Sequence, residues 1–139
     1  RDAGKMHSEM ALQIQKNGSP VSPPAVILSG GETSVTVKGS GRGGPNTEFM
    51  LALLQELRGQ DGIWAIACDT DGIDGTEDNA GAFISPESFK KSEELGLDPS
   101  GFLSNNDSYS FFHELGDLVS PGPTMTNVND FRAILVLPS

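Results

Sequence analysis

The spacing of apolar residues along this chain changes several times between the period of a helix and that of a strand. Helical spacing or helix-start residues mark five segments: residues 3–16, 46–57, 85–95, a short turn from 98–99, and 106–115. Strand patterns mark five others: residues 25–28, 33–38, 63–68, 80–84 and 131–137. Because the two kinds of segment alternate, we predict one α/β domain with a mixed, mostly parallel sheet flanked by helices.

Two local details refine this prediction. Gly30-Gly31 stands between the apolar run 25–28, which suits a buried strand, and the half-buried pattern 33–38, so we expect a hairpin there. Asn46 precedes the second helical segment and is expected to cap it.

Composition limits the class of protein. The chain has 139 residues, enough for one domain, and it contains no apolar run near the ~20 residues that span a membrane. Its one cysteine, Cys68, sits in an apolar run, which fits a reducing, cytoplasmic setting. The net charge of −10 argues against nucleic-acid binding, which needs a basic face.

The start of the chain suggests a longer parent. There is no initiator methionine, and helical spacing begins within the first few residues. We therefore expect residues 1–24 to be a connecting helix and linker from a missing amino-terminal domain, and residues 25–139 to be the α/β domain proper.

A glycine-rich stretch lies between a strand pattern and a helix. Gly39, Gly41 and Gly44 have the spacing of a dinucleotide-binding fingerprint, and Asp69 stands near the position of its usual acidic companion. A plain flexible turn is a second interpretation. A third, which we favour, is that exposed amides at the helix start, with Arg42 beside them, bind a phosphate or carboxylate.

An acidic loop follows the strand pattern 63–68. It carries five carboxylates between residues 69 and 78, which repel one another unless a cation or hydrogen-bond donors are present. The spacing fails as an EF-hand, because Asp74 falls where glycine is required. Asp71 and Asp74 suit a nucleotide-bound magnesium ion better, although a plain solvent loop explains the composition too.

Two polar clusters, residues 105–109 and 122–130, adjoin helix or strand patterns. Capping explains most of the first cluster, whereas the second is as well explained by a pocket at a strand end as by a turn. His7 and His113 have no nucleophile partner in the sequence and are assigned to surface or packing roles.

Taken in order, these motifs resemble one family. The motifs are Ser29-Gly30-Gly31-Glu32-Thr33, Gly41-Arg42-Gly43-Gly44-x-Asn46-x-Glu48, Thr70-Asp71-Gly72-Ile73-Asp74-Gly75, Asn106-Asp107-Ser108-Tyr109 and Gly122-Pro123-Thr124-x-Thr126-Asn127-Val128-Asn129-Asp130. The series resembles the carboxyl-terminal MOFRL domain of glycerate 2-kinases, which are often labelled hydroxypyruvate reductases.

The resemblance implies an ATP- and Mg²⁺-dependent transfer of the γ-phosphoryl group to D-glycerate, giving 2-phosphoglycerate. It implies a Rossmann-like amino-terminal domain of the same parent chain across the cleft, a small-molecule substrate, no nucleic acid and no membrane. A homodimer stays open. Little turnover is expected from these 139 residues alone, because half of the cleft is missing.

The resemblance also suggests roles for individual residues. Arg42 and Asp71 are the catalytic candidates, and Asp71 and Asp74 are the metal candidates. The candidates for substrate or nucleotide binding are Ser29, Gly30, Gly31, Glu32, Thr33, Gly41, Gly43, Gly44, Asn46, Glu48, Thr70, Gly72, Asn127 and Asp130.

This chain departs from the family pattern at one position. Family members often carry arginine directly after the paired glycines, where this sequence has Pro45. Either Arg42 supplies that charge or the acceptor preference differs. Two rival functions remain at this stage: an NAD(P)-dependent hydroxypyruvate reductase, and a non-catalytic binding module.

Overall fold

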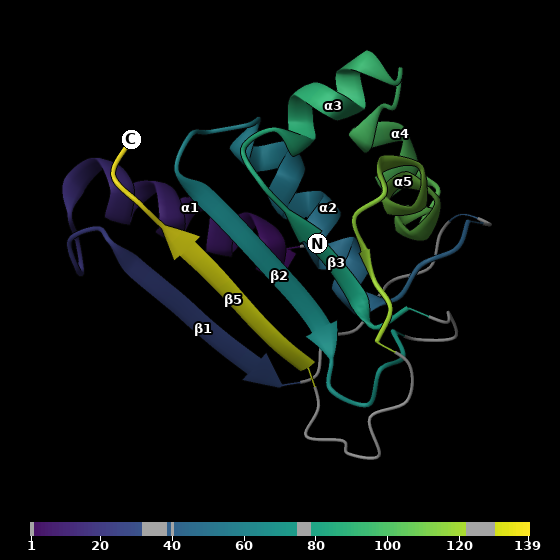
Figure 1. Ribbon diagram of the computed structural model, residues 1–139, viewed down its shortest axis with the longest axis horizontal. Helices are drawn as coiled ribbons and strands as arrows, with labels where there is room; N and C mark the ends of the chain where they lie inside the picture. Colours follow the sequence, from purple (N-terminus) through teal and green to yellow (C-terminus); the bar gives the residue numbers. More distant parts are fainter. Residues whose placement is uncertain (1, 32–38, 40, 75–78, 122–129) are drawn as a thin grey trace.

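A computed structural model describes residues 2–31, 39, 41–74, 79–121 and 130–139 (Figure 1). The helices are α1 (Asp2–Asn17), α2 (Pro45–Leu57), α3 (Ser88–Glu94), α4 (Pro99–Ser104) and α5 (Ser108–Leu115). The strands are β1 (Ala25–Gly31), β2 (Ile63–Asp69), β3 (Gly81–Ile84), β4 (Leu118–Val119) and β5 (Asp130–Val136). The predicted α/β class is confirmed, since helices pack on a five-stranded sheet of order β1-β5-β2-β3-β4. Only the short strand β4 had no counterpart in the strand patterns.

The prediction of a mostly parallel sheet is wrong, because every described strand pair is antiparallel. The reason is the position of β5, which lies between β1 and β2 (Figure 1). Ile134 of β5 is paired with Ile27 on one side and with Ala65 on the other. The strands β1 and β2 run in the same direction, as the two strands of a strand–helix–strand unit do. However, β5 lies between them and is antiparallel to both.

Strand β1 also differs from its prediction as a buried strand. Among the described strands it lies at one edge of the sheet, and its side chains alternate, with Val26 and Leu28 exposed and Ile27 partly buried. The alternation arises because α1 and α2 lie on one face of the sheet only (Figure 1). The second strand of the expected hairpin, residues 33–38, lies outside the described residues.

Helix α2 is the centre of the core. Its buried side chains, among them Met50 and Leu53, belong to one apolar cluster with Phe111 and Phe112 of α5 and Ile134 of the sheet. Helix α1 packs closely on α2, because a Cβ added to Gly4 would lie 2.7 Å from the carbonyl oxygen of Phe49. The division of the chain at residue 24 stays a prediction. None of the described helices is long and apolar enough to cross a membrane.

The start of α2 corrects the prediction that Asn46 is its cap. Gly44 occupies the N-cap position in an extended conformation, and Pro45 is the first helical residue. Proline suits that position because its ring fixes a helical φ and the missing N–H has no intrahelical partner there. Asn46 therefore lies inside the helix, where it is fully buried.

Candidate functional site

The motifs found in the sequence gather at one end of the sheet, where β1 and β2 finish and β5 begins, beside the start of α2 (Figure 1). We call this region the polar end. It comprises residues 29–31, 41–48, 69–74, 105–109 and 130–132. The order of the strands brings them together, since Gly31 and Asp69 are both paired with Asp130.

Asp74 from the acidic loop caps helix α2. One carboxylate oxygen accepts a hydrogen bond from the backbone N–H of Asn46 at 2.9 Å, and the other accepts one from the N–H of Thr47 at 2.9 Å. The cap residue Gly44 has no side chain to accept these bonds. Asp74 thus supplies, from 28 residues along the chain, the acceptor that a helix start needs.

The contact between Gly44 and Asp74 leaves no room for a larger residue. A Cβ added to Gly44 would lie 2.5 Å from both Cγ and the carbonyl oxygen of Asp74. The backbone N–H of Asp74 in turn donates to the carbonyl oxygen of Asn79 at 2.6 Å. Glycine is required at this position so that the acidic loop can pack on the helix start.

Burial raises the pKa of Asp74, and the hydrogen bonds from Asn46 and Thr47 oppose part of that rise. The carboxyl is fully buried, so its charged form loses hydration that these donors only partly replace. The helix start also favours a negative charge there. The amides of Asn46 and Thr47 at the helix start are therefore already bound by an acid of the same chain, and anion binding by the glycine-loop amides stays a prediction.

Asn46 connects two acids beneath the polar end. Its side-chain Nδ2 donates to Asp130 at 2.9 Å and to Asp74 at 3.2 Å. Its Oδ1 atom is buried and accepts no hydrogen bond from the described residues. Asn46 thus ties the start of α2 to the start of β5 and fixes the position of Asp130.

The glycine-rich loop is attached to the start of α5. Gly39 N–H donates to Oδ1 of Asn106 at 2.9 Å, and Gly41 N–H donates to the carbonyl oxygen of Asn105 at 2.8 Å. Arg42 N–H donates to Oδ1 of Asp107 at 2.9 Å. Residues 105–109 therefore hold this loop in addition to starting a helix. The sequence, read as a helix cap, predicted only the second of these roles.

Close packing explains two of the glycines in that loop. A Cβ at Gly41 would overlap the Cα and Cβ of Asp107, and it would lie 2.7 Å from the carbonyl oxygen of Asn105. A Cβ at Gly43 would overlap the hydroxyl of Ser108. These glycines allow two backbones to approach each other, so their spacing does not require a bound dinucleotide.

Arg42 is exposed and rests on an aromatic ring. Its guanidinium carbon lies 4.3 Å from the ring centre of Tyr109, and its carbonyl oxygen accepts the N–H of Tyr109 at 2.8 Å. Stacking of this kind orients an arginine without burying its charge. The arrangement presents a cation at the surface of the polar end.

Polar contacts join α2 to α5 and to Asn106, two residues before it. The hydroxyls of Thr47 and Ser108 are 2.8 Å apart, and the carboxylate of Glu48 accepts hydrogen bonds from Nδ2 of Asn106 at 3.3 and 3.4 Å. Glu48 is buried in this position. Its carboxylate therefore supports the residue that holds Gly39.

A second network, which the sequence did not predict, lies under β1. Arg132 is buried, and its Nε and Nη2 atoms donate to the hydroxyl of Ser29 at 3.0 Å and to the carbonyl oxygen of Gly30 at 3.1 Å. His7 of α1 donates from Nδ1 to Ala3 and contacts the same Ser29 hydroxyl through Nε2 at 3.1 Å.

The network fixes the hydrogen-bond role of Ser29. In the neutral imidazole whose Nδ1–H donates to the carbonyl oxygen of Ala3, Nε2 is an acceptor, so the Ser29 hydroxyl donates to it while its oxygen accepts from Arg132. The packing role assigned to His7 is confirmed by its burial and by its edge contact with Phe49. The sequence feature that could have indicated a buried role for Arg132 is its position inside an apolar strand pattern.

The acids after β2 form local turns. Asp71 N–H donates to the Asp69 carboxylate at 3.1 Å, and Ile73 N–H donates to the Asp71 carboxylate at 2.8 Å. Burial, and then the neighbouring Asp71 and Asp130, raise the pKa of Asp69, although the hydrogen bond from the Asp71 amide opposes this. Burial, with the charges of Asp69, Asp130 and Asp74, raises the pKa of the Cys68 thiol.

No group of three or more acidic, histidine or cysteine side chains among the described residues could enclose a metal ion. Magnesium does not require such a group, because it commonly keeps waters and binds one or two carboxylates together with substrate phosphates. The partly exposed Asp71 fits that pattern. The buried Asp74, with both oxygens bonded to α2, fits it poorly, and the metal role of these two residues stays a prediction.

The structure brings most of the predicted site residues together. Those at the polar end are Ser29, Gly30, Gly31, Gly41, Arg42, Gly43, Gly44, Asn46, Glu48, Thr70, Asp71, Gly72, Asp74 and Asp130. Glu32, Thr33 and Asn127 lie outside the described residues. Binding by any of them stays a prediction.

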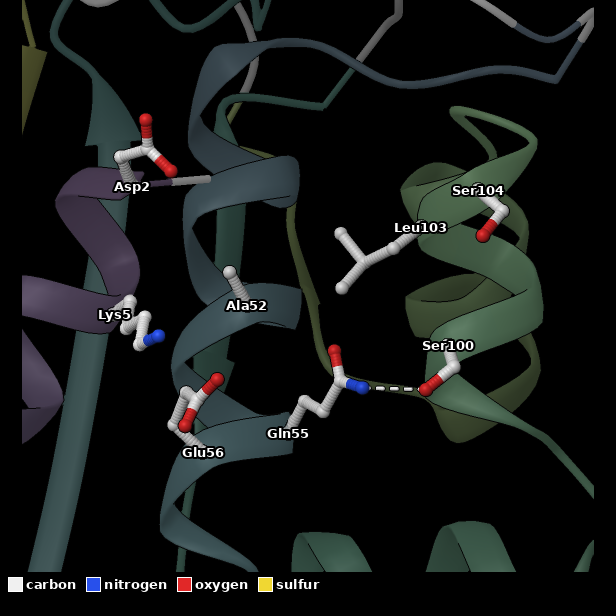
Figure 2. A pocket seen from close by; sticks show the side chains of 8 residues that line it. All are labelled: Asp2, Lys5, Ala52, Gln55, Glu56, Ser100, Leu103 and Ser104. Atoms are coloured by element: carbon white, nitrogen blue, oxygen red, sulfur yellow. Dashed lines mark hydrogen bonds between the residues drawn. The ribbon is translucent and has the colours of Figure 1, made fainter.

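A separate hollow of about 350 Å³ lies between α1, α2 and α4 (Figure 2). Lys5 and Glu56 line it, and a side-chain hydrogen bond from Gln55 to Ser100 crosses one side. None of the predicted site residues borders it. The candidate site is therefore the polar end and not this hollow.

The chain is similar to proteins of known name. It is 39% identical over 137 residues to the D-glycerate 2-kinase of Thermotoga maritima, covering 99% of this chain and 33% of that protein. It is 54% identical over 138 residues to a putative hydroxypyruvate reductase of Agrobacterium vitis, covering 98% of this chain and 32% of that protein.

A solved structure shows the same similarity. The crystal structure of Thermotoga maritima glycerate kinase matches with a TM-score of 0.94 at 38% identity, covering 98% of this chain and 33% of that one. The chain spans about a third of the length of these relatives. Residues 25–130 match the MOFRL family. The chain belongs to the MOFRL family.

Proposed function

We propose that this chain is the carboxyl-terminal domain of a glycerate 2-kinase, and that its polar end forms one wall of the cleft in which ATP phosphorylates D-glycerate to 2-phosphoglycerate. The observation that carries the proposal is the match, over nearly the whole chain, to a kinase of that name and to a solved glycerate kinase. The chain's own contribution is to position charged and polar groups around the reacting phosphoryl group.

Arg42 is the proposed source of positive charge. Phosphoryl transfer spreads negative charge over several oxygens, and a correctly placed arginine stabilises that charge. Arg42 stays exposed while the Tyr109 ring orients its guanidinium and the Asp107 carboxylate accepts its backbone N–H. It lies three residues before Pro45, the position at which the resemblance implies an arginine. We propose that Arg42 takes over the role of that residue.

Magnesium, when bound with ATP, neutralises phosphate charge. Asp71 could hold it or orient the acceptor hydroxyl, because its side chain is partly exposed at the polar end. Asp74 acts through α2 instead, since its carboxylate caps the helix that carries Asn46 and Glu48. Asn46 then sets the position of the buried Asp130.

The remaining predicted binding residues would line the same wall. Ser29 and the Gly30-Gly31 pair lie at the end of β1, where Arg132 donates to the Ser29 hydroxyl and to the Gly30 carbonyl oxygen. The proposed partner across the cleft is a Rossmann-like amino-terminal domain of a longer chain, joined through residues 1–24. A cytoplasmic setting and a homodimer complete the proposal.

A hydroxypyruvate reductase is the second candidate, favoured by the printed names of the Agrobacterium vitis relatives. Its NAD(P) would need the glycine loop and the start of α2 for the pyrophosphate. The Asp74 carboxylate already occupies that helix start, and Asn105 and Asn106 bind the loop amides. A second anion at the same amides would meet repulsion from Asp74, so the geometry favours the kinase.

A hybrid enzyme tests the proposal. The matching third of the Thermotoga maritima kinase is replaced by this chain, and two assays are run on the purified, folded product. We expect ATP-dependent formation of 2-phosphoglycerate from D-glycerate, without hydroxypyruvate-dependent loss of NADH or NADPH. A folded hybrid that oxidises NAD(P)H with hydroxypyruvate and leaves glycerate unphosphorylated would support the reductase instead.

A further inference from the structure

Arg132 is a buried cation at the polar end. The residue is only 5% exposed, although arginine keeps its charge at any physiological pH. None of the described carboxylates forms an ion pair with it. Asp130, two residues earlier on the same face of β5, accepts a hydrogen bond from Asn46. A buried charge without a partner of opposite sign is costly, and a bound anion would remove that cost.

The hydrogen-bond donors of Arg132 are only partly used. A guanidinium carries five N–H groups in one plane, and neighbouring nitrogens form forks that fit paired oxygens. The fork of Nε and Nη2 is occupied, since these atoms donate to the Ser29 hydroxyl at 3.0 Å and to the Gly30 carbonyl oxygen at 3.1 Å. Nη1 is buried and has no acceptor among the described residues. The fork of Nη1 and Nη2 therefore suits the two oxygens of a carboxylate.

Neighbouring side chains hold the guanidinium in a defined place. Its carbon atom Cζ lies 5.2 Å from the ring centre of Phe49, and the same ring makes an edge contact with His7. His7 accepts the Ser29 hydroxyl through Nε2, so the Ser29 oxygen stays turned toward Arg132. A cation fixed between aromatic and buried polar groups interacts more strongly with an anion than a cation in water does.

Two glycines lie between the guanidinium and open space. Gly30 and Gly31 are exposed, and a Cβ added to Gly31 would meet no atom beyond its chain neighbours within 4 Å. A carboxylate can therefore approach the end of β1 at these glycines. To meet it, the guanidinium has to turn and exchange the neutral carbonyl oxygen of Gly30 for a charged oxygen. The exchange is favourable because charge-assisted hydrogen bonds are stronger than neutral ones.

We propose that Arg132 binds the carboxylate of the acceptor, a small 2-hydroxy acid such as D-glycerate. This inference rests on the proposed function and names the residue that recognises the acid group of the substrate. One positive charge in a confined, poorly hydrated place matches the single negative charge of a carboxylate. The phosphates of ATP are larger and more highly charged, and they suit the exposed Arg42 better.

Two acceptors compared in the hybrid kinase test the role of Arg132. D-glyceramide keeps the hydroxyls of D-glycerate but has a neutral amide in place of the carboxylate. Arg132→Met removes the charge and keeps most of the bulk. We expect it to lower kcat/KM for D-glycerate by about 10–100-fold, while kcat/KM for D-glyceramide and KM for ATP change by less than about threefold. A merely structural defect would affect both acceptors alike.

Two further variants complete the comparison. Arg58→Met is the matched control, since Arg58 is exposed at the other end of α2 and its loss should leave the preference for D-glycerate unchanged. Arg132→Lys keeps the charge without the planar fork and should retain only part of the preference. If Arg132→Met does not fold, Arg132→Lys carries the same comparison.

Binding separates this inference from the proposed function. D-glycerate is titrated calorimetrically into the hybrid with and without Arg132→Met. If the wild type binds D-glycerate and the variant binds it at least about tenfold more weakly, the role of Arg132 holds, even if no phosphoryl group is transferred and the kinase proposal fails.

Three results would overturn the role of Arg132 while leaving a kinase function possible. One is equal affinity for D-glycerate in the wild type and a folded Arg132→Met hybrid. Another is an unchanged preference for D-glycerate over D-glyceramide in the folded Arg132 variants. The third is a wild-type hybrid that phosphorylates D-glyceramide as well as it does D-glycerate.

Discussion

The carboxylate of Asp74 accepts the backbone N–H of Asn46 at 2.9 Å, and this bond joins the acidic loop to the first turn of the central helix. Because α2 starts at a glycine and a proline, it has no side chain of its own for this purpose. The acidic loop therefore helps to build the polar end as well as bordering it.

Replacing Asp74 with alanine should lower the free energy of unfolding by about 1–3 kcal/mol, because the buried N–H groups of Asn46 and Thr47 lose their acceptor. Urea unfolding followed by circular dichroism measures this. Asp98→Ala is the control, since Asp98 caps α4 through an exposed hydrogen bond to Ser100. That variant should cost less than about 1 kcal/mol. Equal losses in both variants would contradict the special role of Asp74.

The stability of the fold should change with pH in the direction expected for a carboxyl group whose pKa is raised in the folded state. Since burial raises the folded pKa of Asp74 above its ordinary value of 3.8, the folded state holds its proton to higher pH than the unfolded state does. This contribution to stability is complete below 3.8 and is lost as pH rises through the folded pKa.

The comparison with Asp74→Asn isolates that contribution, because asparagine does not titrate. The stability of the wild type minus that of the variant should fall as pH rises from 3.8 toward neutrality, measured by urea unfolding at fixed ionic strength. A difference that grows with pH would mean that the hydrogen bonds outweigh burial and lower the pKa.

The elements of the fold followed from local patterns, whereas strand direction did not. Apolar periodicity located α1, α2 and β2 because it depends on neighbours a few residues away. The placement of β5 between β1 and β2 depends on pairing over more than 100 residues, as between Ser29 and Arg132. No local pattern contains that information.

The sequence predicted which residues lie together in the candidate site, but not how they contact one another. The motifs around Arg42, Asp71 and Asn106 do meet at one end of the sheet. Their spacing did not show that Asp74 caps a distant helix, or that Asn106 holds the backbone of Gly39. Carboxylates that look like metal ligands in a sequence can instead be acceptors for buried amides.

Gly41→Ala should lower the free energy of unfolding by about 1–3 kcal/mol, since the new methyl group would overlap Asp107 and displace the loop that carries Arg42. Thermal or urea unfolding measures the loss. Gly101→Ala, in the exposed helix α4, should be neutral or stabilising by about 1 kcal/mol. A neutral Gly41→Ala would show that the loop does not need its close contact with α5.

The thiol of Cys68 should react slowly with iodoacetamide near pH 7.5. Burial and three nearby aspartates raise its pKa, so less of the reactive thiolate is present than in an ordinary cysteine. We expect the folded chain to react at least roughly fivefold more slowly than the same chain unfolded in urea at equal pH. Equal rates would contradict the raised pKa.

The central claim is that the polar end of this domain takes part in phosphoryl transfer, and Arg42→Ala in the hybrid kinase tests it most directly. The measurement is kcat for ATP-dependent formation of 2-phosphoglycerate, with Lys90→Ala on α3 as a control that also removes one positive charge. We predict a loss of roughly 10³-fold for Arg42→Ala and little change for the control. A loss of less than about threefold in a folded Arg42→Ala hybrid would remove Arg42 from the transfer step and contradict the account.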